Sequence, residues 1–162
     1  MDGAGRRREA LLALAFGLLL GLYALAASAE TVEEILARDT PPPGIVFEFS
    51  GNEEGLLETA LPRLRADVTR IRDRFADLPI EVVSHGLELL SLSRENAFFY
   101  PTAHEAARAL HAAGITLTVC GAYADDFDLG REDFPAYVDV VPSAPAHRDN
   151  LIALDYLVIP YP

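Results

Sequence analysis

Between Gly44 and Pro160 the chain alternates short apolar runs with longer amphipathic segments, and this alternation constrains the fold more than any other feature. The apolar runs are typical of buried strands; they cover residues 44–50, 79–84, 115–120, 137–141 and 156–160. Parallel strands need a long crossover between them, usually a helix, and such crossovers cover both faces of the sheet. The pattern therefore predicts an α/β protein with three layers, α/β/α, around an open, mainly parallel five-stranded sheet of flavodoxin-like architecture.

The segments between the strands carry helix signals. One apolar stripe, spaced alternately by four and three residues, predicts a helix with Leu57, Leu61, Leu64, Val68, Ile71 and Phe75 on its buried face. Thr102 and Glu105 have the spacing of a capping box, which predicts the start of a helix that ends at Gly114. Ser143 is a favourable N-cap for the last helix.

The first 29 residues have the three parts of an export signal. A basic stretch, residues 6–8, precedes an apolar run over residues 10–27, and Ala27-Ser28-Ala29 matches the small-x-small cleavage pattern. We predict that residues 1–29 are a signal peptide, that residues 30–43 form a linker and that residues 44–162 form one α/β domain of an exported, periplasmic protein. The alternative is an uncleaved anchor through residues 10–27, because about 18 apolar residues reach the lower limit for a membrane span.

Without residues 1–29 the chain is strongly acidic. It then has 10 arginines, no lysine and 23 carboxylates, which give a formal net charge of −13. Such a surface repels nucleic acid and anionic lipid, so neither is expected as a partner. Contact with a membrane is expected only if the signal segment is retained.

A binding rim is expected where the strands end, because ligands of open parallel sheets bind outside the carboxyl ends of the strands. Cys120, the only cysteine, ends one strand, and His85 follows the neighbouring one. Amides at the start of a helical segment favour the thiolate, the reactive form, and an imidazole can act as its base. The other predicted rim residues are Ser50, Gly51, Asn52, Gly86, Gly121, Tyr123 and Ser143.

Three interpretations of Cys120 remain at this point. It is a reactive thiol, a small buried hydrophobe that ends a strand, or one half of a disulfide between subunits. In the second interpretation Cys120 has only a structural role. His85 can also have only a structural role, in which it makes hydrogen bonds to the backbone of its loop.

Other functional sites do not fit the residues. The acidic loop over residues 125–133 lacks the oxygen ligand that a calcium-binding loop needs at Gly130. The histidines outside the rim, His104, His111 and His147, have no second type of metal ligand at a suitable spacing. The chain also lacks a glycine-rich dinucleotide loop and a catalytic serine elbow. We therefore expect neither a metal nor a cofactor.

Three segments in register resemble the DsrE/DsrF-like family of sulfur-relay proteins, in its exported branch. They are residues 80–90, residues 113–121 with Cys120, and residues 129–143. The family's polar pair after Cys-Gly is replaced here by Ala122 and Tyr123. The resemblance covers about residues 44–160.

The resemblance implies a DsrE/DsrF-like fold and homo-oligomers, commonly trimers or hexamers. It also implies that Cys120 carries sulfur as a persulfide, with His85 and Gly86 on the same rim. The partners would then be a protein that donates the sulfur and one that accepts it. The alternative function is a non-enzymatic oligomeric module that binds a ligand or a protein, in which Cys120 is structural.

Overall fold

The computed structural model describes residues 30–162. The predicted signal peptide lies outside these residues, so export and anchoring stay predictions. Between residues 30 and 162 no helix has both the length and the apolar character that crossing a bilayer requires.

The described chain forms one sheet of five parallel strands in the order β4-β3-β2-β1-β5. The strands are β1 (Ile45–Phe49), β2 (Ile80–Ser84), β3 (Thr116–Cys120), β4 (Asp139–Val141) and β5 (Leu157–Pro160). The α-helices are α2 (Val32–Leu36), α3 (Leu56–Arg74), α4 (Pro101–Ala112), α5 (Gly121–Asp125) and α6 (Ala144–Ile152). The predicted three-layer α/β/α fold is confirmed, and the sheet is entirely parallel.

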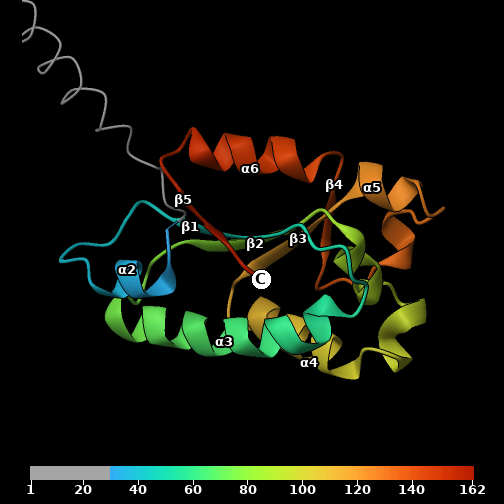
Figure 1. The fold of residues 1–162 in the computed structure, drawn as a ribbon, viewed down its shortest axis with the longest axis horizontal. Coiled ribbons are helices and arrows are strands. Elements are labelled where there is room, and N and C mark those ends of the chain that lie inside the picture. The colour runs from blue at the N-terminus through green and yellow to red at the C-terminus, as the bar shows by residue number, and fades with distance from the viewer. Residues whose placement is uncertain (1–29) are drawn as a thin grey trace, which may run out of the picture.

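The strand order explains why α6 lies apart from the other long helices. From β1 to β4 the chain adds each strand on the same side of the last, and it then returns past β1 to form β5. Crossovers between parallel strands are almost always right-handed, so reversing the direction moves the connecting helix to the opposite face. Accordingly α6 covers one face of the sheet, whereas α2, α3 and α4 lie on the other (Figure 1).

The face of the sheet toward α3 and α4 is the apolar one. The predicted stripe of α3 is buried there, with Leu57, Leu61, Leu64 and Ile71 at most 1% exposed. The core reaches into the predicted linker as well, because Ile35 of α2 is fully buried. Burial of this stripe is the main reason that α3 is stable, since the hydrophobic effect grows with the apolar area removed from water.

The predicted capping box at Thr102 is wrong. Helix α4 begins at Pro101 with Tyr100 rather than Thr102 at the N-cap, and its first turn makes no side-chain cap of its own. Glu58 of α3 supplies the cap instead, since its carboxylate accepts hydrogen bonds from the backbone amides of Thr102 and Ala103 at 3.1 and 2.8 Å. A partner distant in the sequence therefore replaces the local one.

Two further differences concern the strand ends. The predicted fourth strand loses its first two residues, and β4 begins at Asp139. The segment after β2 forms two short 3-10 helices that the sequence pattern did not indicate, η2 (Leu87–Leu92) and η3 (Glu95–Phe98). A third 3-10 helix, η4 (Arg131–Asp133), precedes β4.

Candidate functional site

The sheet register places three predicted site residues in one row at the carboxyl edge. Phe49 pairs with Ser84 and Ser84 with Val119 across β1, β2 and β3. The residues that follow are Ser50, His85 and Cys120. Side chains alternate between the faces of a sheet and neighbouring strands lie about 4.8 Å apart, so this row is on the α6 face with His85 between its two neighbours.

Cys120 is the free thiol of this row. Its side chain is 5% exposed, and it pairs with Val141 of β4 through the sheet register. The chain turns into α5 directly after it, so Cys120 occupies the N-cap position of a helix of one turn. The thiol thus lies at the end of its strand, where the sequence pattern predicted it, and is almost completely covered by the protein.

His85 belongs to a charged cluster that joins β1, β2 and α6. Its Nε2 lies 2.8 Å from Oε1 of Glu48, and Nη1 of Arg148 donates to the same oxygen at 2.5 Å. Burial raises the pKa of Glu48, but the hydrogen bonds from His85 and Arg148 outweigh it and hold the pKa below its usual range. Glu48 is therefore an ionised carboxylate, 14% exposed, one strand from His85.

A second pair of the same kind lies on the same face. Nε2 of His147 is 2.8 Å from Oε2 of Glu81, so the adjacent residues His147 and Arg148 of α6 each hold a strand carboxylate. Ala144 and Leu151 are the only buried residues of α6. Hydrogen bonds to the strand carboxylates, more than an apolar stripe, thus attach this helix to the sheet.

The loops that end β1 and β2 meet over a buried carboxylate. Glu88 is fully buried, and its Oε1 accepts hydrogen bonds from Ser84 Oγ at 2.7 Å and from the amide of Gly86 at 3.0 Å. Within residues 30–162 its Oε2 has no hydrogen-bond partner. A Cβ atom on Gly86 would lie 2.4 Å from that oxygen and 2.4 Å from the carbonyl oxygen of Gly51, so only glycine fits there.

A hollow of about 460 Å³ opens between the ends of β1 and β5, and Ser50, Gly51, Asn52 and Tyr161 contribute to its wall. This is where the strand order reverses, the position at which open α/β sheets usually bind ligands. Three of the predicted rim residues are therefore brought together at the switch point. Neither His85 nor Cys120 lines this hollow.

The other predicted rim residues have structural positions. Gly121 lies against β4, where a Cβ atom would be 3.0 Å from the carbonyl oxygen of Val141. Tyr123 is half-buried and packs on the ring of Phe127 with centroids 5.5 Å apart. Ser143 caps α6 and lines a separate hollow of about 310 Å³. These three residues do not join the row of Ser50, His85 and Cys120.

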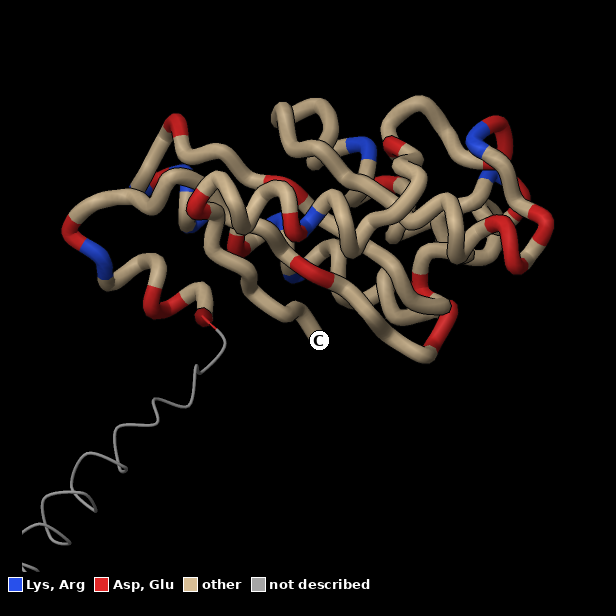
Figure 2. The backbone as a smooth tube through the Cα atoms, turned by 90° about the horizontal axis from the view of Figure 1, so that it is seen from above, with Lys and Arg blue, Asp and Glu red and all other residues tan. Residues whose placement is uncertain are grey.

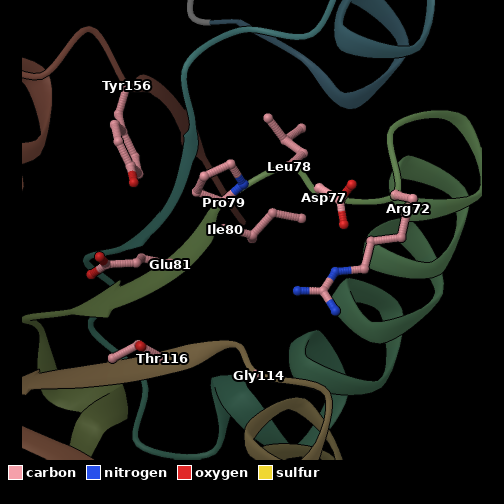
Figure 3. Close-up of a pocket in the computed structure, with 10 residues that line it drawn as sticks. Arg72, Asp77, Leu78, Pro79, Ile80, Glu81, Gly114, Thr116 and Tyr156 are labelled. Atoms are coloured by element: carbon pink, nitrogen blue, oxygen red, sulfur yellow. The ribbon is translucent and has the colours of Figure 1, made fainter.

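Another hollow, of about 420 Å³, lies at the amino ends of the strands, away from the rim (Figure 3). Arg72 lies on one side of it, and Glu81, Thr116 and Tyr156 lie on the other. Arg72 already donates to the carbonyl oxygen of Ala113 at 2.6 Å, and Glu81 is held by His147. The buried Nε of Arg72 has no hydrogen-bond partner within residues 30–162. Because the guanidinium and the carboxylate each have another partner in the protein, we assign no ligand to the hollow.

The predicted acidic character extends over the described chain. Acidic positions are spread along the whole backbone and basic ones are few (Figure 2). In the predicted acidic loop Asp125, Asp126, Asp128 and Glu132 are exposed. These carboxylates form a solvated surface next to α5.

Glu48 and Arg148 are the site residues that the sequence analysis did not identify. Glu48 had a signal: it is the one charged residue in an otherwise apolar strand. Arg148 had none, because its partner is 100 positions away in the sequence.

Comparison with solved structures supports the fold. The protein of unknown function MTH1491 from Methanobacterium thermoautotrophicum superposes with a TM-score of 0.59 and 19% identity, over 72% of this chain and 96% of its own. The YchN protein of E. coli superposes with a TM-score of 0.52 and 15% identity, over 72% of this chain and 98% of its own. No family model and no curated protein matches the sequence. These likenesses show the fold, which is DsrE/DsrF-like as the three sequence segments indicated.

Proposed function

We propose that this protein is a sulfur carrier of the exported DsrE/DsrF-like type, in which Cys120 holds sulfur as a persulfide. The observation that carries the proposal is the row at the carboxyl edge, where the free thiol that ends β3 and the residue after β2, His85, lie on the same face of neighbouring strands. The DsrE/DsrF-like fold and the resemblance of residues 113–121 to the family's cysteine segment support it.

The chemistry is an exchange at sulfur. The thiolate of Cys120 attacks the outer sulfur of a donor persulfide, the bond between the two donor sulfurs breaks, and the donor leaves as a thiolate that takes up a proton. Attack by an acceptor thiolate on the outer sulfur of the Cys120 persulfide reverses the exchange and delivers the sulfur. The partners proposed are therefore a persulfide donor protein and a thiol acceptor protein.

We expect the purified protein to gain the mass of one sulfur atom after exposure to a low-molecular-weight persulfide, and Cys120→Ala to gain none. Intact-mass spectrometry measures the adduct, and treatment with a reducing thiol should remove it. Since Cys120 is the only cysteine, any adduct on the variant would be at a different residue. Absence of an adduct on the unmodified sequence at every donor concentration would contradict the proposal.

The burial of Cys120 supports a second candidate function. At 5% exposure the side chain resembles a packed core residue, and the hollow at the switch point lies on a different part of the rim. In this case the protein is a non-enzymatic module that binds a ligand or protein, and Cys120 is structural. A thiol that resists alkylation in the folded protein but reacts in denaturant would favour this function.

We propose that the protein assembles into a trimer or hexamer and that Phe98 and Phe99 lie in its interface. Their side chains are 85% and 68% exposed and pack edge to face with ring centroids 5.6 Å apart. Asn96 fixes the segment, because its Nδ2 donates to Oε1 of Glu54 and to the carbonyl oxygen of Leu90. Exposed aromatic groups held in place are typical of surfaces that bury them in an assembly.

Replacing both phenylalanines by serine is expected to shift the assembled species to monomer in sedimentation velocity, because the apolar area available to the interface is lost. The matched control replaces Ile152 and Leu154, which are also exposed, by serine. That control should leave assembly unchanged. A monomeric protein with the natural sequence, or dissociation of the control alone, would contradict the placement of the interface.

A further inference from the structure

Glu48 determines which nitrogen of His85 is free. An ionised carboxylate only accepts hydrogen bonds, so the Nε2 that faces it at 2.8 Å must carry a proton. In the neutral imidazole the lone pair is then on Nδ1, and this nitrogen is the one that can take a proton. Arg148 fixes the carboxylate from the other side through the same oxygen atom.

His85 and Cys120 lie on neighbouring strands and on the same face, according to the register of β2 and β3. A nucleophile, a neighbouring base and a third group that orients the base form the arrangement by which proteins activate weak nucleophiles. The row at the rim contains all three parts, contributed by β3, by the end of β2 and by β1.

We propose that Glu48 is a positioning residue for the thiol chemistry of Cys120, acting through the tautomer and the charge of His85. The inference rests on the function proposed above for Cys120. The register places the two residues on the same face, and within residues 30–162 no hydrogen bond joins their side chains. In the activating step the side chains approach each other and the Sγ proton moves to Nδ1 of His85, which leaves a thiolate and an imidazolium whose positive charge faces Glu48. No oxidant or further reactant is needed.

Glu48 and Arg148 have opposite effects on a positive charge at His85. Glu48 stabilises the imidazolium, whereas Arg148, reaching over from α6, opposes it. Asp149 pairs with Arg148 at 2.7 Å, and Asp139 of β4 lies 3.8 Å from Arg131. The pair Glu81–His147 is also on this face, and its members are hydrogen-bonded to each other at 2.8 Å. The second pair supplies a matched control, because it has the same chemistry without contact to His85.

The test is the pH dependence of alkylation of Cys120 by iodoacetamide in the purified full-length chain, where no other cysteine reacts. In Glu48→Gln the midpoint of the rate–pH curve should rise by about one pH unit, and the rate at pH 7 should fall roughly tenfold, the size expected for loss of one nearby opposite charge. In Arg148→Gln the midpoint should fall, and in Glu81→Gln it should not move. His85→Asn should raise the midpoint at least as far as Glu48→Gln, and the double variant should not differ from His85→Asn.

An unchanged curve in Glu48→Gln overturns the inference, and so does an equal shift in Glu81→Gln, which would indicate the general field of the protein. A further shift in the double variant overturns it too, because the two residues would then act separately. If Glu48→Gln does not fold, Arg148→Gln provides the test: a lower midpoint of the rate–pH curve supports the inference, and an unchanged midpoint overturns it. Persulfide loading of the same samples separates the two proposals. If the rate–pH curve shifts in Glu48→Gln but the protein takes up no sulfur, only the carrier function is refuted. If the protein takes up sulfur but the curve does not shift, only the role of Glu48 is refuted.

Discussion

Gly86→Ala is expected to destabilise the folded protein by about 3 kcal/mol, the upper range for an atom forced into a packed site. The added Cβ would lie 2.4 Å from the carbonyl oxygen of Gly51, 2.8 Å from its amide nitrogen and 2.4 Å from Oε2 of Glu88. Two of these three atoms are backbone, so the clash is relieved only by separating the loops that end β1 and β2. Urea unfolding followed by circular dichroism measures the loss.

Gly55→Ala is the matched control for this substitution. Gly55 precedes α3, and a Cβ atom there would lie 3.4 Å from the nearest side-chain atom, on Tyr100, which is an ordinary contact. We expect a change within about 0.5 kcal/mol. If the two variants lose the same free energy of unfolding, the close approach of the loops at Gly86 and Gly51 is not what makes Gly86→Ala unstable.

Acid is expected to destabilise the protein through His104. This side chain of α4 is 2% exposed, and both ring nitrogens have partners: Ser91 O at 2.9 Å from Nε2 and Tyr137 Oη at 2.5 Å from Nδ1. A carbonyl oxygen only accepts, so Nε2 donates and Nδ1 accepts the hydroxyl proton of Tyr137. Burial lowers the pKa of His104, and the positive charge of Arg108 lowers it further, despite the opposing hydrogen bond with Ser91.

The sign of the pH effect follows from the proton balance. In the unfolded chain the imidazole takes up a proton near pH 6.5, whereas in the folded protein it does so only at lower pH. The stability contribution is therefore complete above about pH 7.5 and is lost as the pH falls through 6.5 toward the folded pKa. The slope approaches about 1.4 kcal/mol per pH unit for one proton.

The variant His104→Gln isolates this effect. At pH 7.5 it should lose about 2 kcal/mol, because the Tyr137 hydroxyl and the Ser91 carbonyl lose well-placed partners. Between pH 7.5 and 5.5 its stability should fall less than that of the natural sequence. The control His111→Gln changes an exposed histidine of the same helix and should keep the natural pH dependence. Identical slopes for the natural sequence and His104→Gln would refute the assignment.

The elements that the sequence predicted well are those whose signals are local. The alternation of apolar runs located all five strands, and the stripe from Leu57 to Phe75 located α3. Because loops after parallel strands gather at one edge, the order of the elements was also sufficient to bring Ser50, His85 and Cys120 together.

The features that were missed depend on contacts between distant residues. Thr102 had the local spacing of a capping box, yet Glu58, 44 positions earlier, caps the helix. Glu48 interrupts an apolar strand, which signals a buried charge, but nothing near it in the sequence indicates Arg148 as its partner. Ser143, Gly121 and Tyr123 were grouped with the rim because each follows a strand, and the contacts that the structure shows for them are to Ala146, β4 and Phe127.

The position of β5 has a consequence for the order in which the parts of the site around Cys120 assemble during folding. Strands β1 to β4 join through successive crossovers, but β5 pairs with β1, and Ile45 lies opposite Leu157. Pairing between segments so distant in the chain closes a long loop and is slow. The segment that forms β5 also contains α6, and with it Arg148. In a newly made chain β3 can therefore form, with Cys120 at its end, before Arg148 reaches Glu48. We expect the reactivity of Cys120 to change when α6 and β5 are added in the last step of folding.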